Sequence, residues 1–446
     1  MTDTRTATSI DALVSEYVAR NPTSRQLFER AQRVLPGGNT RTGAWFDPFP
    51  PYIDSATGVY LNDVDGHQLL DFAFNNSSLI LGHAYPAVVD AIRVQVARGT
   101  AYNRPTEMEI ELAEELQQRV PSLERIRFCN SGTEAVMNAI RAAIAFTGKR
   151  KIARFEGAYN GTSDHALVSL APPIGPEAGP AERPRPIRSS VGLSSAADDV
   201  IILPFNNAVA CQALIEEHAA DLAAVVLDPL MTNAGVILPE DDFLPTIRKV
   251  TESLGVLLIF DEIIAFRIAP GGAQQALGIT PDLTAFAKIM AGGTAGGAFG
   301  GRADIMRPYD PTRSGTKIPQ AGTFNANPLM LTAGLTTLRL LTPDVYTRMA
   351  SMARRVRDEL VGAFREAGFQ ASGNAVGSIF RLYLTPEPPR NYRETVQDDT
   401  SVQRRLLFWL LNRDIHWQQG GYISAVTEDE HLNRLTAEVR TAVRDL

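Results

Sequence analysis

Lys288 is the residue of this sequence best suited to chemistry that needs an amine. The chain has only five lysines, and Lys288 is the one with apolar residues on both sides, since it directly follows the run Leu283–Ala287. A lysine removed from water has a lowered pKa and can act as a nucleophile toward carbonyl groups and as a general base. The alternative is an ordinary lysine at a strand end whose amine reaches solvent.

An acidic pair occupies the corresponding position after a second apolar run. Asp261-Glu262 follows Val256–Phe260, which has the length and composition of a buried strand. Ligands of open α/β sheets bind at the carboxyl ends of the strands, so a carboxylate here can point into such a site. It can equally cap the helix that follows, and position alone leaves both interpretations open.

A third run ends in a turn that suits an anion. Arg125–Cys129 is followed by Ser131-Gly132-Thr133 and by an apolar helical pattern over Thr133–Phe146. Backbone N–H groups and the dipole at the start of a helix attract phosphate, although Ser and Thr are also common helix caps. A phosphate site, a carboxylate and a buried lysine at three strand ends are together what pyridoxal phosphate requires, and we predict a site for this cofactor.

The elements that must position these residues alternate between short apolar runs and longer amphipathic ones from about residue 60 to 320. This alternation predicts an α/β fold in which a mostly parallel sheet carries helices on both faces. The expected strands are Arg125–Cys129, Lys151–Phe155, Val200–Leu203, Ala223–Leu227, Val256–Phe260 and Leu283–Ala287. The Pro- and Gly-rich stretch 171–198 is expected to be a long loop, either a lid or a flexible surface loop.

A change of composition along the chain predicts three parts. Residues 1–60 form an N-terminal arm that packs with the small domain, and residues 61–327 form the large, cofactor-binding domain. Residues 328–446 form a smaller α+β domain, which begins with helical patterns at Pro328–Leu341 and Val345–Ala367.

Composition narrows the class of protein. The 446 residues carry a formal net charge of −7, so no overall basic surface for nucleic acid is expected. The two cysteines cannot form a disulfide framework, and no long apolar run predicts a membrane span or a signal peptide. The six histidines show no metal-ligand spacing, so no metal site is expected. A cytoplasmic enzyme is the default expectation.

Five motifs follow one another in order and strengthen the cofactor prediction. They are NSGTEA (130–135), GAYNG (157–161), LLIFDEII (257–264), AFAKIMAGG (285–293) and GTFNANP (322–328). With them the sequence resembles, over about residues 30–435, the class III aminotransferases of fold type I. Within these it is most similar to the branch of glutamate-1-semialdehyde aminomutase and the β-amino-acid (β-phenylalanine) aminotransferases. The resemblance implies a large domain with a mostly parallel, seven-stranded sheet between helices, a smaller α+β domain, and a homodimer with shared active sites.

The resemblance also implies roles for matching residues around pyridoxal phosphate. Lys288 would form the Schiff base with the cofactor and carry the proton between substrate and cofactor. Asp261 would pair with the protonated ring nitrogen. Ile263 would pack against one face of the ring and Tyr159 would stack on the other.

Further matches concern the phosphate and the surroundings of the ring. The resemblance implies that Ser131, Gly132 and Thr133 hold the phosphate. Thr323 would reach the phosphate bound by the partner subunit. Asp228 stands where relatives usually have glutamate, and we expect it to keep a supporting hydrogen-bond role.

Two segments depart from the family pattern. The start PGGNTRTGAWF (36–46) differs from the aminomutase-type PGGVNSPVRAF, which argues against glutamate-1-semialdehyde itself as substrate. Its Arg41 matches the arginine with which β-amino-acid aminotransferases bind the substrate carboxylate, while Trp45 and Phe46 would line an apolar pocket or pack the arm. The stretch from Asp261 to Arg267 is one residue shorter than in relatives, which leaves the role of Arg267 open.

The function predicted from these residues is a ping-pong aminotransferase that uses pyridoxal phosphate, with a β-amino acid as the expected donor and a keto compound as acceptor. The stretch WQQGGYIS (417–424) lacks an arginine that relatives carry there, so the usual 2-oxoglutarate acceptor is left open. One alternative is an aminomutase that moves the amine within one substrate. Another is a non-catalytic scaffold, against which the intact Lys288 and Asp261 count.

Overall fold

The computed structural model describes residues 9–315, 317–396 and 398–445, so the first eight residues of the predicted arm lie outside the described residues. Its centre is a seven-stranded sheet with the strand order β4-β10-β9-β8-β7-β5-β6. The strands are β4 (Arg125–Cys129), β5 (Lys151–Phe155), β6 (Val200–Leu203), β7 (Leu222–Leu227), β8 (Leu257–Asp261), β9 (Leu283–Ala287) and β10 (Gly297–Gly301). All pairings from β9 through β6 are parallel, which confirms the predicted α/β fold with a mostly parallel sheet.

The strand β10 is the one member of this sheet that the sequence does not predict. It is antiparallel to both neighbours, β4 and β9, and three of its five residues are glycines, which are rare in strands. Because glycine has no Cβ, the backbone of β4 and of the turn after it can lie close to β10. A Cβ on Gly297 would lie 2.4 Å from the carbonyl oxygen of Ser131, and one on Gly300 would lie 2.3 Å from that of Arg125. The other six strands match the predicted ones to within one residue at each end.

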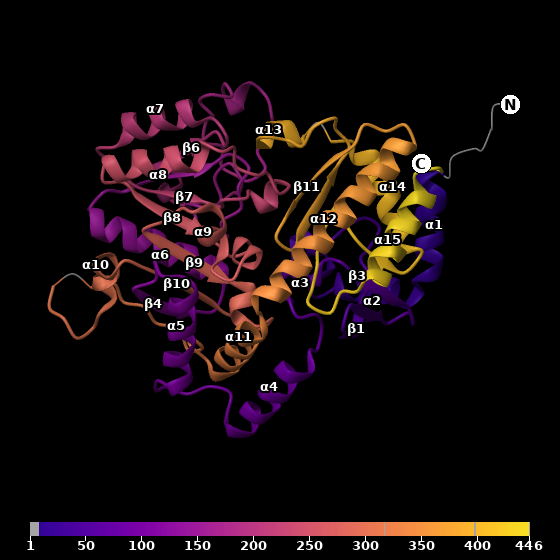
Figure 1. The fold of residues 1–446 in the computed structure, drawn as a ribbon, viewed down its shortest axis with the longest axis horizontal. Helices are drawn as coiled ribbons and strands as arrows, with labels where there is room; N and C mark the ends of the chain where they lie inside the picture. The colour runs from indigo at the N-terminus through magenta and orange to yellow at the C-terminus, as the bar shows by residue number, and fades with distance from the viewer. Residues whose placement is uncertain (1–8, 316, 397, 446) are drawn as a thin grey trace.

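Helices cover both faces of the sheet, as Figure 1 shows. The long apolar helix α6 (Gly132–Thr147) packs on one face, while α7 (Ala208–His218) and α8 (Phe243–Ser253) pack together over the other. Alternate residues of β7 separate accordingly: Val226 belongs to the apolar cluster of α6, and Val225 to that of α7 and α8. Because both faces are buried there, the central strands β7, β8 and β9 are almost continuously apolar rather than alternating.

A second sheet joins the two ends of the chain. It has the order β1-β2-β3-β13, and β13 (Ile415–His416) runs parallel to β3 (Gln68–Asp71). The first two strands are β1 (Ile53–Thr57) and β2 (Tyr60–Asp63). The predicted boundary between residues 60 and 61 therefore falls inside β2.

The smaller domain is built on the antiparallel sheet β11-β12-β14. Its elements are β11 (Ser372–Val376), β12 (Ile379–Tyr383), β14 (Gly420–Tyr422), α12 (Pro343–Glu366), α13 (Tyr392–Thr395), α14 (Thr400–Leu411) and α15 (Asp429–Ala442). The N-terminal helices α1 (Ile10–Arg20) and α2 (Pro22–Ala31) lie beside them in Figure 1, and the rings of Tyr17 and Phe408 are 5.4 Å apart.

The remaining helices complete the larger domain. They are α3 (Phe74–Ser77), α4 (Pro86–Arg98), α5 (Glu107–Arg119), α9 (Gly272–Leu277), α10 (Ala303–Met306) and α11 (Pro328–Leu340). Because α11 packs on α4 and α5, the predicted boundary between residues 327 and 328 separates this helix from its packing partners. Among the helices of the described residues, none is both long and apolar enough to cross a membrane.

The predicted loop 171–198 contains only two short 3-10 turns, Pro176–Ala178 and Ser195–Asp199 at its end. It is bonded to the smaller domain through α13. The Tyr392 hydroxyl donates to the carbonyl of Pro172 at 2.9 Å, and Arg393 Nη1 donates to the carbonyl of Gly179 at 2.9 Å.

Candidate active site

A cavity of about 540 Å³, called the site cavity below, opens at the carboxyl ends of the central parallel strands. Nine of the ten predicted site residues line it, from six different segments of the chain: Arg41, Ser131, Gly132, Thr133, Tyr159, Asp228, Asp261, Ile263 and Lys288. The tenth, Thr323, does not. The common edge of the sheet therefore brings together residues up to 157 positions apart in the chain, from Ser131 to Lys288, and Arg41 joins them from the N-terminal segment.

Lys288 follows β9 directly and is half-buried in the wall of the site cavity. Its φ of +53° is in the left-handed region, which a non-glycine residue adopts only when its surroundings enforce it. Burial lowers the pKa of Lys288 to about 8, helped by the charge of Arg267 and opposed by the carboxylates of Asp261 and Asp228. A substantial share of this amine is therefore neutral, and nucleophilic, near physiological pH.

The two acidic residues at the end of β8 have different roles, since Asp261 lines the site cavity and Glu262 caps a helix. Asp261 lines the site cavity and is 5% exposed. Glu262 is fully buried and accepts hydrogen bonds from the backbone N–H groups of Ala273, at 2.6 Å, and Gln274, at 3.2 Å. Glu262 thus caps the start of α9, while Asp261 is left to act in the cavity.

Asp261 is balanced between its two protonation states. Burial, and after it the neighbouring carboxylate of Asp228, raise the pKa of Asp261 to about 7. Two donors oppose this: Asn160 Nδ2 at 2.8 Å from Oδ2, and the backbone N–H of Ile263 at 3.2 Å from Oδ1. A cationic ring nitrogen placed beside this carboxylate would shift it to the ionised form.

A chain of hydrogen bonds that the sequence did not reveal leads from Arg154 through Asn160 to Asp261. Arg154, in the middle of β5, is 1% exposed and donates from Nε and Nη2 to Asn160 Oδ1 at 3.3 and 3.1 Å. Its other donors reach the backbone carbonyls of Val168 and Ala158. A guanidinium can only donate, so the amide oxygen of Asn160 must face Arg154 and its N–H must face Asp261. The only sequence signal was an arginine between apolar residues of a strand that is buried beyond Lys151.

Asp228 directly follows β7, and its hydrogen bonds stay within its own loop. Its Oδ2 accepts from the backbone N–H and the hydroxyl of Thr232, at 2.8 and 2.6 Å, and its Oδ1 accepts from Leu230 N–H at 3.1 Å. Burial nevertheless raises the pKa of Asp228. Toward Asp261 it therefore acts as a second negative charge, not as a hydrogen-bond partner.

The turn after β4 has the form of an anion cradle. Ser131 caps α6, because its hydroxyl accepts the N–H of Glu134 at 3.2 Å. Gly132 packs so closely that an added Cβ would lie 2.6 Å from Ile263 Cδ1. Phosphate would bind to the free N–H groups at the start of this 16-residue helix, beside the Thr133 hydroxyl. With the buried Asp261 and the desolvated Lys288, this donor set fits pyridoxal phosphate.

Arg41 reaches the site cavity from the N-terminal segment and is held by one hydrogen bond. Its Nη1 donates to Asn75 Oδ1 at 2.7 Å. Asn75 belongs to α3, a left-handed turn in which Phe74, Asn75, Asn76 and Ser77 have φ from 44° to 76°. Such a turn costs about 1–2 kcal/mol per residue, so its surroundings must hold it.

The clamp on this turn is Asp71, which is 1% exposed. Its carboxylate accepts the N–H groups of Ala73 and Phe74, at 2.8 and 3.0 Å, which begin the turn. It also lies 2.8 Å from His83 Nε2 and 2.9 Å from His416 Nδ1. Paired with these groups, Asp71 has a strongly lowered pKa, although burial opposes the shift.

Arg267, whose role was open, has a structural one. It is fully buried, and its guanidinium donates to Ser378 Oγ at 2.8 Å and to the carbonyls of Ser77 and Ile423 at 2.9 and 2.8 Å. It also lies 4.8 Å from the centre of the Tyr422 ring. These bonds tie the left-handed turn to the smaller domain, and Arg267 is not among the residues that line the site cavity.

Thr323 is exposed and borders a different cavity, beside Phe324, whose side chain is 58% exposed. One chain therefore does not bring Thr323 to its own site cavity.

Comparison with known proteins agrees with this geometry. Residues 42–376 match the model of the family described as Aminotransferase class-III. A glutamate-1-semialdehyde 2,1-aminomutase of Methanothermobacter thermautotrophicus is 40% identical over 415 residues, which cover 92% of this chain and 96% of that protein.

Solved structures give the same result. An omega-transaminase from Sphaerobacter thermophilus superposes with a TM-score of 0.92 at 41% identity, covering 96% of this chain and 99% of that one. A β-phenylalanine aminotransferase from Variovorax paradoxus superposes with a TM-score of 0.88 at 32% identity, covering 97% of both chains. Since the family model spans most of the chain and the site holds the groups that pyridoxal phosphate needs, this protein belongs to the class III aminotransferases, enzymes that depend on that cofactor.

Proposed function

We propose that this enzyme transfers the amino group of a β-amino acid, or of a similar amine with a distant carboxylate, to a keto acceptor in two half-reactions. The observation that carries this proposal is the placement of Arg41 in the cavity that Lys288 and Asp261 line. A guanidinium can bind a carboxylate through two parallel hydrogen bonds. Arg41 donates to the neutral amide oxygen of Asn75, so the positive charge of Arg41 stays available for a carboxylate.

The residues of the chain would divide the work as follows. Pyridoxal phosphate, when bound, supplies an aldehyde that condenses with amines and a ring that accepts electrons from the adjacent carbon. Lys288 would hold the cofactor and then, as a neutral amine, take the proton from the substrate carbon. Asp261 would hold a proton on the ring nitrogen, and Asn160 would keep Asp261 ionised while it does so. Ile263 and Tyr159, both in the wall of the cavity, would enclose the ring.

The remaining assignments also belong to this proposal. Ser131, Gly132 and Thr133 would receive the phosphate, and Asp228 would act beside Asp261. The exposed Thr323 would complete the site of a second subunit in a homodimer, which accounts for its place outside the cavity of its own chain. A cytoplasmic location stays an expectation from composition.

A second candidate is an aminomutase that moves the amine within one molecule. The similarity to relatives named glutamate-1-semialdehyde 2,1-aminomutase, at 40% identity, favours it. The two candidates differ in one measurable respect, since only the mutase would turn over a single substrate with no added acceptor.

The test is the visible absorption spectrum of the purified enzyme before and after β-phenylalanine is added without an acceptor. Conversion of the cofactor band to that of its amine form is expected, because the first half-reaction leaves the amino group on the cofactor. The Arg41→Ala variant is the matched control and should need much more substrate for the same conversion. A band that does not move would reject β-amino acids and leave the mutase as the next candidate.

A further inference from the structure

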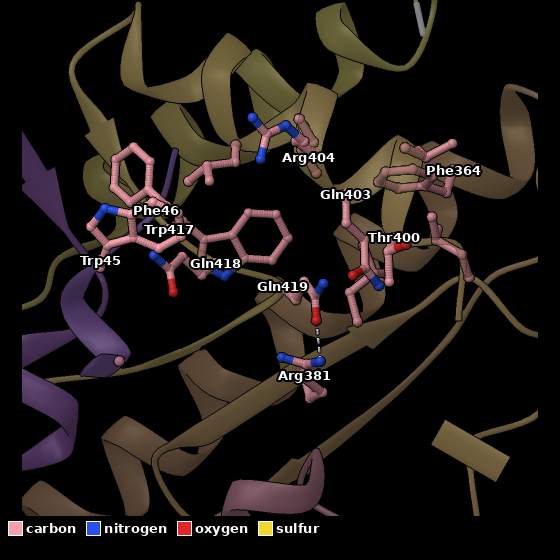
Figure 2. A pocket seen from close by; sticks show the side chains of 16 residues that line it. Trp45, Phe46, Phe364, Arg381, Thr400, Gln403, Arg404, Trp417, Gln418 and Gln419 are labelled. Carbon is pink, nitrogen blue, oxygen red and sulfur yellow. Dashed lines mark hydrogen bonds between the residues drawn. The ribbon is translucent and has the colours of Figure 1, made fainter. Parts of the chain in front are cut away.

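A second cavity of about 510 Å³ lies in the smaller domain, and it shares no lining residue with the site cavity. Its walls come from the segment 43–46, Phe364 of α12, the end of β12, the helix α14 and the stretch 417–419. Figure 2 shows Trp45 and Phe46 gathered on one side of it and Thr400 and Gln403 on the other. We call this space the arm cavity.

The arm cavity combines an apolar wall with cationic and neutral donors. Trp45 is 50% exposed although its neighbours are aromatic and aliphatic, so part of an apolar surface remains uncovered. The lining side chains are apolar, amide, hydroxyl or arginine, and no carboxylate occurs among those that the structure describes.

Arg381 is the charge in this cavity that lacks a counter-ion. Its Nη2 donates to Gln419 Oε1, a neutral oxygen, and within the described residues no carboxylate forms an ion pair with it. Asp398 acts on it only through space, and the Asp398 Oδ1 already accepts the N–H of Leu384 at 2.8 Å. Burial lowers the pKa of Arg381 but leaves a guanidinium cationic at neutral pH.

Arg404, on the opposite wall, provides a contrast. Its Nη2 lies 3.1 Å from Asp47 Oδ2, so its charge is already compensated.

Three further N–H groups in the walls are buried and lack an acceptor among the described residues: Arg381 Nε, Gln403 Nε2 and Trp417 Nε1. An excess of donors over acceptors around one cation that has no ion-pair partner among the described residues favours an anionic ligand.

We propose that the arm cavity is a binding site for a small carboxylate with an apolar body, in which Arg381 binds the carboxylate and Trp45 and Phe46 contact the apolar part. The volume is within the range of small-molecule sites, which are typically apolar with a few convergent polar groups. This site is separate from the proposed transamination and does not depend on it.

Tryptophan fluorescence tests the site directly. Two of the three tryptophans of the chain, Trp45 and Trp417, line the arm cavity, and none lines the site cavity. The enzyme carrying its cofactor is titrated with phenylacetate, which has no amine to transfer, and with neutral phenylacetamide. Phenylacetate should change the fluorescence saturably, and phenylacetamide should bind at least about tenfold more weakly. In Trp45→Phe the amplitude should fall while the affinity stays near that of the wild type.

Two variants remove the uncompensated charge in different ways. Arg381→Gln deletes it, and Gln419→Glu neutralises it in place through the existing contact, so that one variant remains informative if the other does not fold. Each should weaken phenylacetate about tenfold or more, whereas Arg404→Gln should change the affinity by less than about threefold.

Three results would overturn the proposal. They are the absence of saturable change up to millimolar phenylacetate, an unchanged affinity in both Arg381→Gln and Gln419→Glu, and loss of binding in Arg41→Ala alone. The last result would place phenylacetate in the site cavity, which would support the proposed function while rejecting the second site.

Discussion

Replacing Asn160 by leucine should raise the pKa of Asp261 without changing the volume of the site greatly. Asn160 Nδ2 is the one side-chain donor to Asp261 in the described structure, at 2.8 Å, and both residues are buried. A hydrogen bond to a charged group is worth about 1.5–3 kcal/mol. At about 1.4 kcal/mol for each pKa unit, its loss raises the pKa of Asp261 from about 7 to about 8–9.

The sign of the effect follows from which protonation state the bond favours. Asn160 donates, so it stabilises the ionised carboxylate, and its removal favours the protonated acid. At pH 7 the ionised fraction of Asp261 would fall from about one half to about one tenth or less. Pyridoxal phosphate with a protonated ring nitrogen should then bind at least about fivefold more weakly.

The assay is a carbon NMR titration of the cofactor-free enzyme labelled with ¹³C at the aspartate carboxyl groups, with Asp261→Asn to assign the signal. Asn138→Leu is the matched control, because Asn138 is also buried but donates to the carbonyl of Glu134 at 2.8 Å and not to Asp261. Arg154→Met should shift Asp261 in the same direction, since it removes the group that orients the Asn160 amide. A folded Asn160→Leu variant whose Asp261 titrates like the wild type would refute the reasoning.

Three further predictions concern other parts of the site. Arg41→Ala should raise KM for carboxylate substrates about 10- to 100-fold and leave the KM of amines without a carboxylate unchanged. Steady-state kinetics with both substrate classes check this. An equal change of KM in both classes would contradict it. Gly132→Ala should weaken cofactor binding, because its Cβ would lie 2.6 Å from Ile263 Cδ1, and a second change, Ile263→Val, should restore part of the affinity measured by equilibrium titration. If the single variant binds as tightly as the wild type, the turn has more room than the structure indicates. The rate at which the cofactor-free enzyme captures pyridoxal phosphate should rise with pH and level off above about pH 8, because Lys288 then becomes neutral. Stopped-flow absorbance measures this rate. A rise that continues to pH 10 would indicate a solvated lysine.

Local sequence is enough to locate the central sheet and the core of the site. Fully buried parallel strands are continuous apolar runs, and this local property located six of the seven strands to within one residue. The carboxyl ends of such strands share one edge, so the sequence alone places Ser131, Asp261 and Lys288 together. A short motif that contains a strand end and the residue after it therefore indicates both where the strand lies and which residue is at the edge of the sheet.

The way in which those residues are supported depends on the tertiary structure. β10 depends on glycines that make room for neighbouring backbones, and composition alone disfavours a strand there. The Asn160 amide faces Asp261 because a buried Arg154 lies behind it, and Arg267 is buried on three distant acceptors and does not line the site cavity. The uncompensated charge of Arg381 likewise depends on what surrounds it. In each case the partner is set by packing between segments far apart in the chain, so the local sequence that determines an element does not determine its contacts.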